Sequence, residues 1–140
     1  MRGFLLDTCV ISESTRQRAA AKVIRWLDAR APESLFLSVV SVAELEQGIA
    51  RVDNATHARK LEAWLSDSVL PQFESRLLDV DLPVARRWGR LLGSGKRRGE
   101  PAPVVDALLA ATALEHELTL VTRNVADFDR FNLHVFDPWQ

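Results

Sequence analysis

The sequence predicts an α/β fold with a mainly parallel sheet. Short apolar or β-branched runs, which are typical of buried strands, alternate with longer segments whose apolar residues recur at helical spacing. Strands that alternate with helices favour parallel pairing, because each helix carries the chain back across the sheet. The chain has 140 residues, 47% of them hydrophobic, so we expect a single domain over residues 1–140.

Five strands are predicted, each a short run that ends at polar or turn-forming residues. They cover residues 4–6, 35–40, 77–80, 118–121 and 134–136. The first strand is followed directly by Asp7, and in open parallel sheets ligands bind beyond the carboxyl ends of the strands. We therefore expect Asp7 at the functional edge of the sheet.

Apolar residues at helical spacing predict five helices between these strands. They cover residues 17–30, 41–49, 55–70, 83–92 and 104–114. The second and third are expected to form a hairpin around Asp53 and Asn54. Pro83 suits the first turn of a helix, and the glycine-rich, basic stretch from Gly93 to Pro101 is expected to end that helix as a loop. The last helix is apolar nearly all round, so we expect it to be central.

Composition narrows the classes of function. Eighteen Lys and Arg against nineteen Asp and Glu give a net charge of −1, which argues against a generally basic nucleic-acid coat. The single cysteine, Cys9, excludes an intrachain disulfide and a cysteine-based zinc site, and suits a reducing compartment. The apolar start is too short for a signal peptide, and no apolar run has the length of a membrane span. We expect a soluble, cytoplasmic protein.

Three carboxylates in distant parts of the chain are candidate catalytic residues, although each also has a structural explanation. Asp7 ends the first strand, where it would alternatively cap a turn. Glu44 lies three residues after Ser41, which is the spacing of a capping box. Asp106 follows Pro103 in the first turn of a helix, where the helix dipole alone favours a carboxylate. The apolar residues around Asp106 suggest that it faces inward, which a role at the helix end does not explain.

Asn124 and Asp127 follow the fourth predicted strand and are expected to bring another oxygen to the same edge, unless they serve only as turn or cap residues. Clustered carboxylates repel one another, and a hard cation such as Mg²⁺ or Mn²⁺ with oxygen ligands relieves that repulsion. The three histidines, His57, His116 and His134, lie on different elements without ligand spacing, so we do not expect zinc.

Four blocks of the sequence together resemble the signature blocks of PIN domains. They begin at Leu5, Ser41, Asp106 and Val121 and read LLDTCVIS, SVAELEQG, DALLAATA and VTRNVADF. The likeness covers almost the whole chain and is greatest to the VapC and FitB proteins, which bacteria encode beside a small antitoxin. The resemblance implies a three-layer α/β/α fold with a five-stranded parallel sheet, a homodimer, a VapB-like antitoxin partner and Mg²⁺- or Mn²⁺-dependent endoribonuclease activity.

Carried over residue by residue, the resemblance implies three acidic metal-binding positions, namely Asp7, Glu44 and Asp106. The fourth acidic position falls on Asn124, where aspartate is frequent, and Asp127 lies three residues further on, so either of them is the expected fourth ligand. Thr8 and Thr122 match hydroxyl positions that line the same site. Cys9 stands where asparagine or serine is also common.

An acidic site repels RNA unless a basic rim compensates for its charge. Two basic clusters are candidates for this RNA-binding rim, with solvated surface charge as the alternative for both. They are Arg16, Arg18 and Lys22 in the first helix and Lys96, Arg97 and Arg98 in the glycine-rich loop. The predicted hairpin with Leu61, Trp64 and Leu65 is the candidate contact for a protein partner, because large aromatic residues often anchor interfaces. Core packing is the alternative role for Trp64.

Two other functions remain open from the sequence. A FitB-like module that acts with its partner as a DNA-bound regulator, with a weak or idle acidic site, would carry the same blocks. A phosphatase of the haloacid dehalogenase type also begins with an aspartate at a strand end. That class needs a second aspartate two residues later, where this chain has Cys9.

Overall fold

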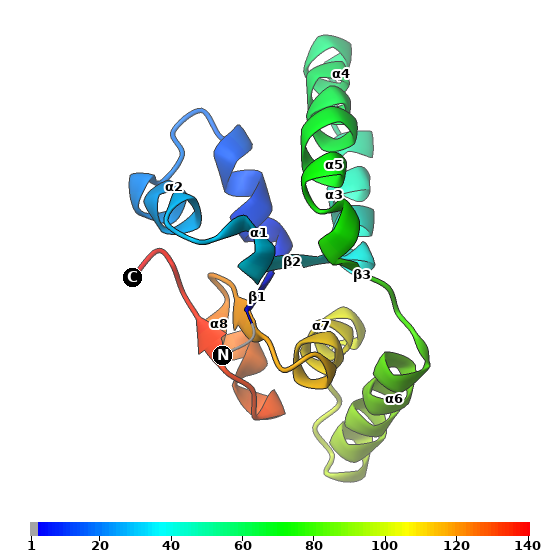
Figure 1. Ribbon diagram of the computed structural model, residues 1–140. Helices are drawn as coiled ribbons and strands as arrows, with labels where there is room; N and C mark the ends of the chain where they lie inside the picture. Colours follow the sequence, from blue (N-terminus) through cyan, green and yellow to red (C-terminus); the bar gives the residue numbers. More distant parts are fainter. Residues whose placement is uncertain (1–2) are drawn as a thin grey trace.

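The computed structural model, which describes residues 3–140, contains a five-stranded parallel sheet (Figure 1). The strands are β1 (Phe4–Leu6), β2 (Leu35–Ser38), β3 (Leu77–Leu78), β4 (Thr119–Val121) and β5 (Val135–Phe136). They lie in the order β3-β2-β1-β4-β5, and every neighbouring pair is parallel. The predictions of an α/β fold and of five strands are therefore confirmed.

Strand β1 occupies the centre of the sheet. Phe4 pairs with Leu35 of β2 on one side and with Thr119 of β4 on the other. The chain builds β2 and β3 outward on one side before it returns to build β4 and β5 on the other, so the strand order reverses at β1. Ligand sites of open parallel sheets lie at such a reversal, beyond the carboxyl ends of the strands. Asp7 is the residue that follows β1 at this position.

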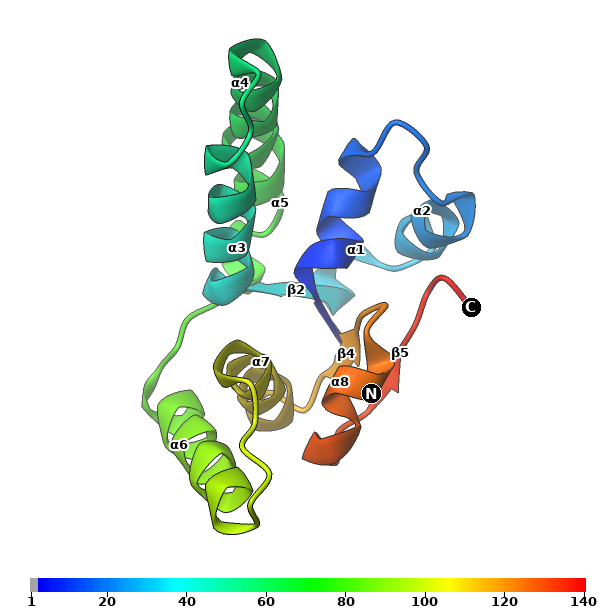
Figure 2. The ribbon, with the colours of Figure 1, turned by 180° about the vertical axis from the view of Figure 1, so that it is seen from behind.

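Helices cover both faces of the sheet (Figures 1 and 2). One face carries α1 (Thr8–Ser12), α2 (Ala21–Asp28), α3 (Val39–Ala50), α4 (Ala55–Trp64) and α5 (Leu70–Gln72), and the other carries α6 (Leu82–Arg97), α7 (Val104–Glu115) and α8 (Val125–Phe128). Short 3-10 turns are η1 (Glu13–Thr15), η2 (Pro32–Ser34), η4 (Glu74–Arg76) and η5 (Asp129–Phe131), and η3 (Leu65–Val69) is a π-helical stretch that joins α4 to α5. The three-layer α/β/α architecture is confirmed.

The alternation of side chains along β1 creates two hydrophobic cores. Phe4 and Leu6 pack with residues of α1 to α5, including Leu45, whereas Leu5 packs with Ala110 of α7 and Phe128 of α8. Successive strand residues point to opposite faces, so a strand that is covered on both sides must be apolar throughout. This explains why β1 is a continuous apolar run.

Two predicted element boundaries near the start of α3 are wrong. The second strand ends at Ser38 rather than at residue 40, because the Ser38 hydroxyl accepts a hydrogen bond from the Val40 N–H at 3.0 Å and caps α3. Ser41 therefore lies inside α3, and the capping box that was the alternative role for Glu44 does not exist.

Two helices near the start of the chain also differ from the prediction. The helix predicted over residues 17–30 is shorter, at Ala21–Asp28, and the short helix α1 after Asp7 was not predicted.

The predicted loop from Gly93 to Pro101 is also wrong in part, because α6 continues to Arg97. Gly95 is buried in that helix, and a Cβ there would lie 2.8 Å from the Glu100 carbonyl oxygen. The glycine thus allows close packing of the following loop rather than ending the helix. The predicted hairpin is confirmed, with Asn54 capping α4 beside α3. Among residues 3–140, no helix combines the length and the apolar character needed to cross a membrane.

Candidate active site

Asp7 is a buried carboxylate, 8% exposed, that the protein holds from two sides. Its Oδ1 accepts a hydrogen bond from the Thr8 N–H at 2.8 Å, and its Oδ2 accepts one from the Thr122 hydroxyl at 2.7 Å. Its own N–H donates to the Val121 carbonyl at 2.9 Å and extends the pairing of β1 with β4. Asp7 therefore caps α1, which agrees with the alternative role that the sequence offered for it. This cap lies at the carboxyl edge of the sheet.

Thr122 is fully buried and links Asp7 to the loop that follows β4. Its hydroxyl donates to Asp7 and accepts from the Asn124 N–H at 3.1 Å. A hydroxyl has one hydrogen to donate, so this donor is committed to the Asp7 carboxylate. The side chain of Thr122 therefore sets both the position of Asp7 and the start of the turn that carries Asn124.

The Cys9 thiol lies beside the same two groups, 3.9 Å from Asp7 Oδ2 and 3.8 Å from the Thr122 hydroxyl oxygen. Burial, followed by the charge of Asp7, raises the pKa of this thiol, against the opposing effect of nearby hydrogen bonds. The sulfur therefore stays protonated at neutral pH and adds no further negative charge beside Asp7.

Glu44 approaches the start of α1 from α3. Its Oε1 accepts a hydrogen bond from the Thr8 hydroxyl at 2.6 Å, so Thr8 holds Glu44 through its hydroxyl and Asp7 through its N–H. The sequence did not predict this contact, and it offered a capping box with Ser41 as the alternative role for Glu44. Ser38, a second good N-cap residue directly before the apolar helix pattern, is the signal that the helix begins earlier and that Ser41 is not its cap.

Asp106 lies in the first turn of α7 and is half-buried. Its pKa is raised, first by burial and then by the negative charges of Asp127, Asp7 and Glu44. Charges separated by more than about 8–10 Å in solvent are largely screened at ordinary ionic strength. The four carboxylates, which come from four separate segments, therefore share one electrostatic environment.

The two candidates for the fourth ligand differ in their surroundings. Asn124 precedes α8, its side chain is exposed, and it makes no side-chain cap to that helix. Asp127 is also exposed, and its charge is the one that raises the pKa of Asp106 most. The electrostatics thus connect Asp127 to the other carboxylates, whereas Asn124 is connected to them through its backbone bond to Thr122.

The donor set suits a hard divalent cation, because its members are carboxylate and amide oxygens. A cation would also relieve the repulsion that raises the pKa of Asp106. Within residues 3–140, however, no three acidic, histidine or cysteine side chains are spaced closely enough to hold a metal ion as they stand. The chemistry of the donor set, rather than its spacing, therefore fits Mg²⁺ or Mn²⁺.

The two predicted basic clusters lie at different elements of the fold. Lys96, Arg97 and Arg98 are exposed at the end of α6, and the short loop after them leads to α7 and Asp106. Arg130 holds that loop by donating to the carbonyls of Glu100 and Pro101. Arg16, Arg18 and Lys22 are exposed beyond the far end of α1 and η1, where Arg16 lies 3.9 Å from the buried Glu13.

Replacement of Thr122 by valine should destabilise the protein, because valine has nearly the same shape but leaves the buried Asp7 Oδ2 with only the weak thiol donor of Cys9, 3.9 Å away. We expect the free energy of unfolding to fall by about 1–3 kcal/mol. Urea denaturation in EDTA at pH 7 measures it. Thr122→Ser keeps the hydroxyl and is the matched control. An equal loss in both variants would show that packing rather than the hydrogen bond is responsible.

Replacement of Asp106 by asparagine should stabilise the metal-free protein at neutral pH. Because its pKa is raised by folding, the folded state binds the proton more tightly, and stability is lost as the pH rises through the raised pKa. Asp106→Asn removes that loss, so its gain in thermal midpoint should shrink as the pH falls through the raised pKa and should be absent below the ordinary value of 3.8. Thermal unfolding in EDTA across this range tests it, with exposed Asp67→Asn as control. A gain that persists at low pH would contradict the electrostatic explanation.

Comparison with known proteins agrees with this geometry. The PIN domain family model matches residues 4–132. Toxin FitB of Neisseria gonorrhoeae is 38% identical to this chain, and the alignment covers 96% of this chain and 97% of that protein. VapC ribonuclease Y4jK of Sinorhizobium fredii is 33% identical, and the alignment covers 97% of both chains. The crystal structure of FitAcB from Neisseria gonorrhoeae superposes with a TM-score of 0.91 at 38% identity, over 98% of this chain and 99% of that one. Further solved structures with this fold are toxin–antitoxin complexes, some with bound DNA. The chain belongs to the PIN-domain family, among its FitB- and VapC-like members.

Proposed function

We propose that the chain is a metal-dependent endoribonuclease and the toxin component of a VapBC-type toxin–antitoxin pair. The observation that carries the proposal is the hydrogen-bonded pair of acids beyond β1, where Thr122 and the Thr8 N–H hold Asp7 and the Thr8 hydroxyl holds Glu44. Asp106 and Asp127 add negative charge to the same environment, and carboxylate oxygens of this kind suit Mg²⁺ or Mn²⁺. The relatives named as a VapC ribonuclease and as Toxin FitB support the same function. They favour a nuclease over a DNA-bound regulator with an idle acidic site.

Asp7, Glu44 and Asp106 would hold the metal, with Asp127 or Asn124 as a further ligand. A divalent cation held there would supply activation of water and polarisation of the scissile phosphate, and hydrolysis would leave a 5′-phosphate and a 3′-hydroxyl. The side chains around the site contribute by fixing the positions of the acidic ligands. Thr122 and the Thr8 N–H fix the Asp7 carboxylate, and the Thr8 hydroxyl orients Glu44.

A basic rim is part of the proposal, because an acidic site attracts RNA only where positive charge compensates for it. Lys96, Arg97 and Arg98 are suited to this role, since they are exposed and only a short loop separates them from the helix that carries Asp106. Arg16, Arg18 and Lys22 are exposed around η1 and α2 and would extend the rim there. Helix α2 lies on the other side of the sheet from α6 (Figure 1).

Replacement of Asp7 by asparagine tests the proposed function. Asparagine keeps the shape but removes the charge of the best-fixed ligand. Loss of a residue that only hydrogen-bonds to a metal ligand lowers activity by roughly 10–100-fold. Asp7 is a proposed ligand itself, so we expect the cleavage rate to fall by more than this. The assay uses antitoxin-free protein and labelled RNA with Mg²⁺, Mn²⁺ or EDTA, and Asp67→Asn is the control. Cleavage at the wild-type rate by Asp7→Asn, or undiminished cleavage in EDTA, would reject the proposal.

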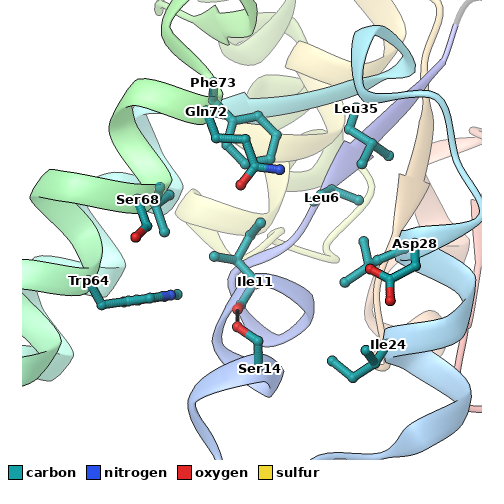
Figure 3. A pocket seen from close by; sticks show the side chains of 12 residues that line it. Leu6, Ile11, Ser14, Ile24, Asp28, Leu35, Trp64, Ser68, Gln72 and Phe73 are labelled. Carbon is teal, nitrogen blue, oxygen red and sulfur yellow. Dashed lines mark hydrogen bonds between the residues drawn. The ribbon is translucent and has the colours of Figure 1, made fainter.

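The antitoxin would bind on the opposite face of the molecule from α6 and α7, in a hollow of about 230 Å³ between α1 and α2 on one side and the α4–α5 arm on the other. Figure 3 shows the Trp64 ring pointing into this hollow towards Ile11, with Ser68 and Asp28 at its edges. Trp64 is partly buried and packs against the core, so both roles predicted for it have a basis. A hollow with apolar walls and a polar edge fits an apolar side chain of a partner.

Trp64→Ala should weaken the complex with the co-expressed antitoxin by about 2 kcal/mol or more, which is roughly 30-fold in the dissociation constant, if Trp64 anchors the partner. Ser68→Arg fills the hollow from its exposed edge without removing core contacts, and it should weaken binding as well. Calorimetric titration compares both with exposed His57→Ala as control. Two folded variants that bind the antitoxin as tightly as wild type would exclude this hollow.

A further inference from the structure

The outward face of α6 carries a row of arginines. Six of the eighteen Lys and Arg residues lie between residues 82 and 98, a stretch without Asp or Glu. Val84 and Gly95 are buried and mark the inward face of the helix. Arg86, Arg90 and Arg97 are exposed, and at 3.6 residues per turn their spacing puts them on the opposite face. The chain's positive charge is thus concentrated along one helix of a protein whose net charge is −1.

The fold makes no use of these three side chains. Within residues 3–140, Arg86, Arg90 and Arg97 take part in no ion pair or hydrogen bond of their side chains. Their neighbour Arg87, by contrast, donates to Glu115 of α7 at 2.8 Å. The eleven helical steps from Arg86 to Arg97 extend about 16 Å along the helix axis. The unpaired arginines therefore form a line rather than a point of charge.

Two glycines lie on the same exposed face, between the arginines. A Cβ at Gly89 or Gly93 would meet nothing within 4 Å, so no packing within the chain requires a glycine there. Glycine destabilises the interior of a helix relative to alanine. These residues leave a strip of bare helix backbone beside the arginines, along which an extended polyanion can lie close to the helix.

The row leads towards the carboxylates. Helix α6 packs on α7 and lies outermost in both views (Figures 1 and 2). Its last turn, with Arg97, is followed by the short loop to α7 and Asp106, so Arg97 is the end of the row nearest to the candidate active site. Near the other end, a hollow of about 340 Å³ opens beside Arg86 and Arg90.

We propose that this α6 track, defined as Arg86, Arg90 and Arg97 with Gly89 and Gly93 between them, binds the phosphate backbone of single-stranded RNA beyond the cleaved bond. The inference rests on the proposed ribonuclease function and specifies how the substrate is held. Arginine binds phosphate through several donors in a planar fork. RNA is the polyanion that fits, because the track ends near the proposed ribonuclease site. The negative charge of that site repels RNA, and the arginines of the track would offset the repulsion.

The test compares RNA binding by the full chain carrying Asp7→Asn, which prevents cleavage, with and without Arg86→Gln, Arg90→Gln and Arg97→Gln. Arg51→Gln, Arg59→Gln and Lys60→Gln, exposed residues of the α3–α4 hairpin, remove the same charge elsewhere. The probe is labelled oligouridine in a long and a short form. Because each phosphate contact on a single strand contributes about 0.7 to the salt slope, loss of the track should reduce the slope by about 2 for the long form. The short form and the hairpin variant should change little.

A second variant tests the track without changing its charge. Gly89→Gln with Gly93→Gln places side chains on the bare strip, and glutamine is a better helix former than glycine. We expect weaker binding of the long oligouridine with a thermal midpoint at or above that of the parent. Binding equal to the parent would show that the backbone strip plays no part and would overturn that element of the track.

The remaining outcomes separate this inference from the proposed function. A wild-type chain that cleaves RNA, together with an arginine variant of unchanged salt slope, overturns the α6 track and leaves the ribonuclease proposal standing. A chain that neither cleaves nor binds RNA overturns both. An equal loss in the hairpin control shows a general charge effect and overturns the track. Normal RNA binding with weakened affinity for the antitoxin or for DNA assigns the α6 face to that partner instead.

Discussion

The buried hydrogen bond between Thr122 and Asp7 is the constraint on which the site depends. A carboxylate that is almost wholly removed from water is costly unless donors replace its hydration. Here the donors come from two elements, the Thr8 N–H at the start of α1 and the Thr122 hydroxyl after β4. Thr122 reaches Asp7 because β1 and β4 pair in register, with Leu6 opposite Val121. A shift of one residue would turn the hydroxyl to the other face of the sheet.

The net charge of −1 is the sum of an acidic region and a basic region in different parts of the fold. At the carboxyl edge of the sheet, burial and the charges of three other carboxylates raise the pKa of Asp106. Along α6 and at its C-cap, six basic residues lie in a stretch of sequence without Asp or Glu. The first arrangement opposes folding in the absence of a cation, as binding sites commonly do. The second supplies the attraction that a polyanionic substrate needs to approach the first.

The sequence predicted the strands and the position of Asp7 because apolar runs and their polar ends are local signals. It failed where one residue type has two meanings. Ser38 and Ser41 are both good cap residues. The structure shows that the pairing of β2 with β3 ends at Ser38, and that α3 therefore begins after Ser38. The glycines after Leu92 indicate either a helix end or a close approach, and the contact of Gly95 with Glu100 distinguishes these only in three dimensions. Helix α1 is too short to show a period, so the bond from Thr8 to Glu44 was beyond sequence reasoning.

The candidate site is held firmly on one side and loosely on the other. Hydrogen bonds from Thr8 and Thr122 fix Glu44 and Asp7, whereas within residues 3–140 no side-chain donor holds the carboxylates of Asp106 and Asp127. This asymmetry explains why four carboxylates influence one another while no three stand at ligand spacing. Asp7 and Glu44 are therefore the acids that the fold itself positions, and the acids of α7 and α8 would complete the ligand set of a cation. The end of α6 leads into α7, so the side with the less constrained carboxylates is also the side that the basic end of α6 adjoins.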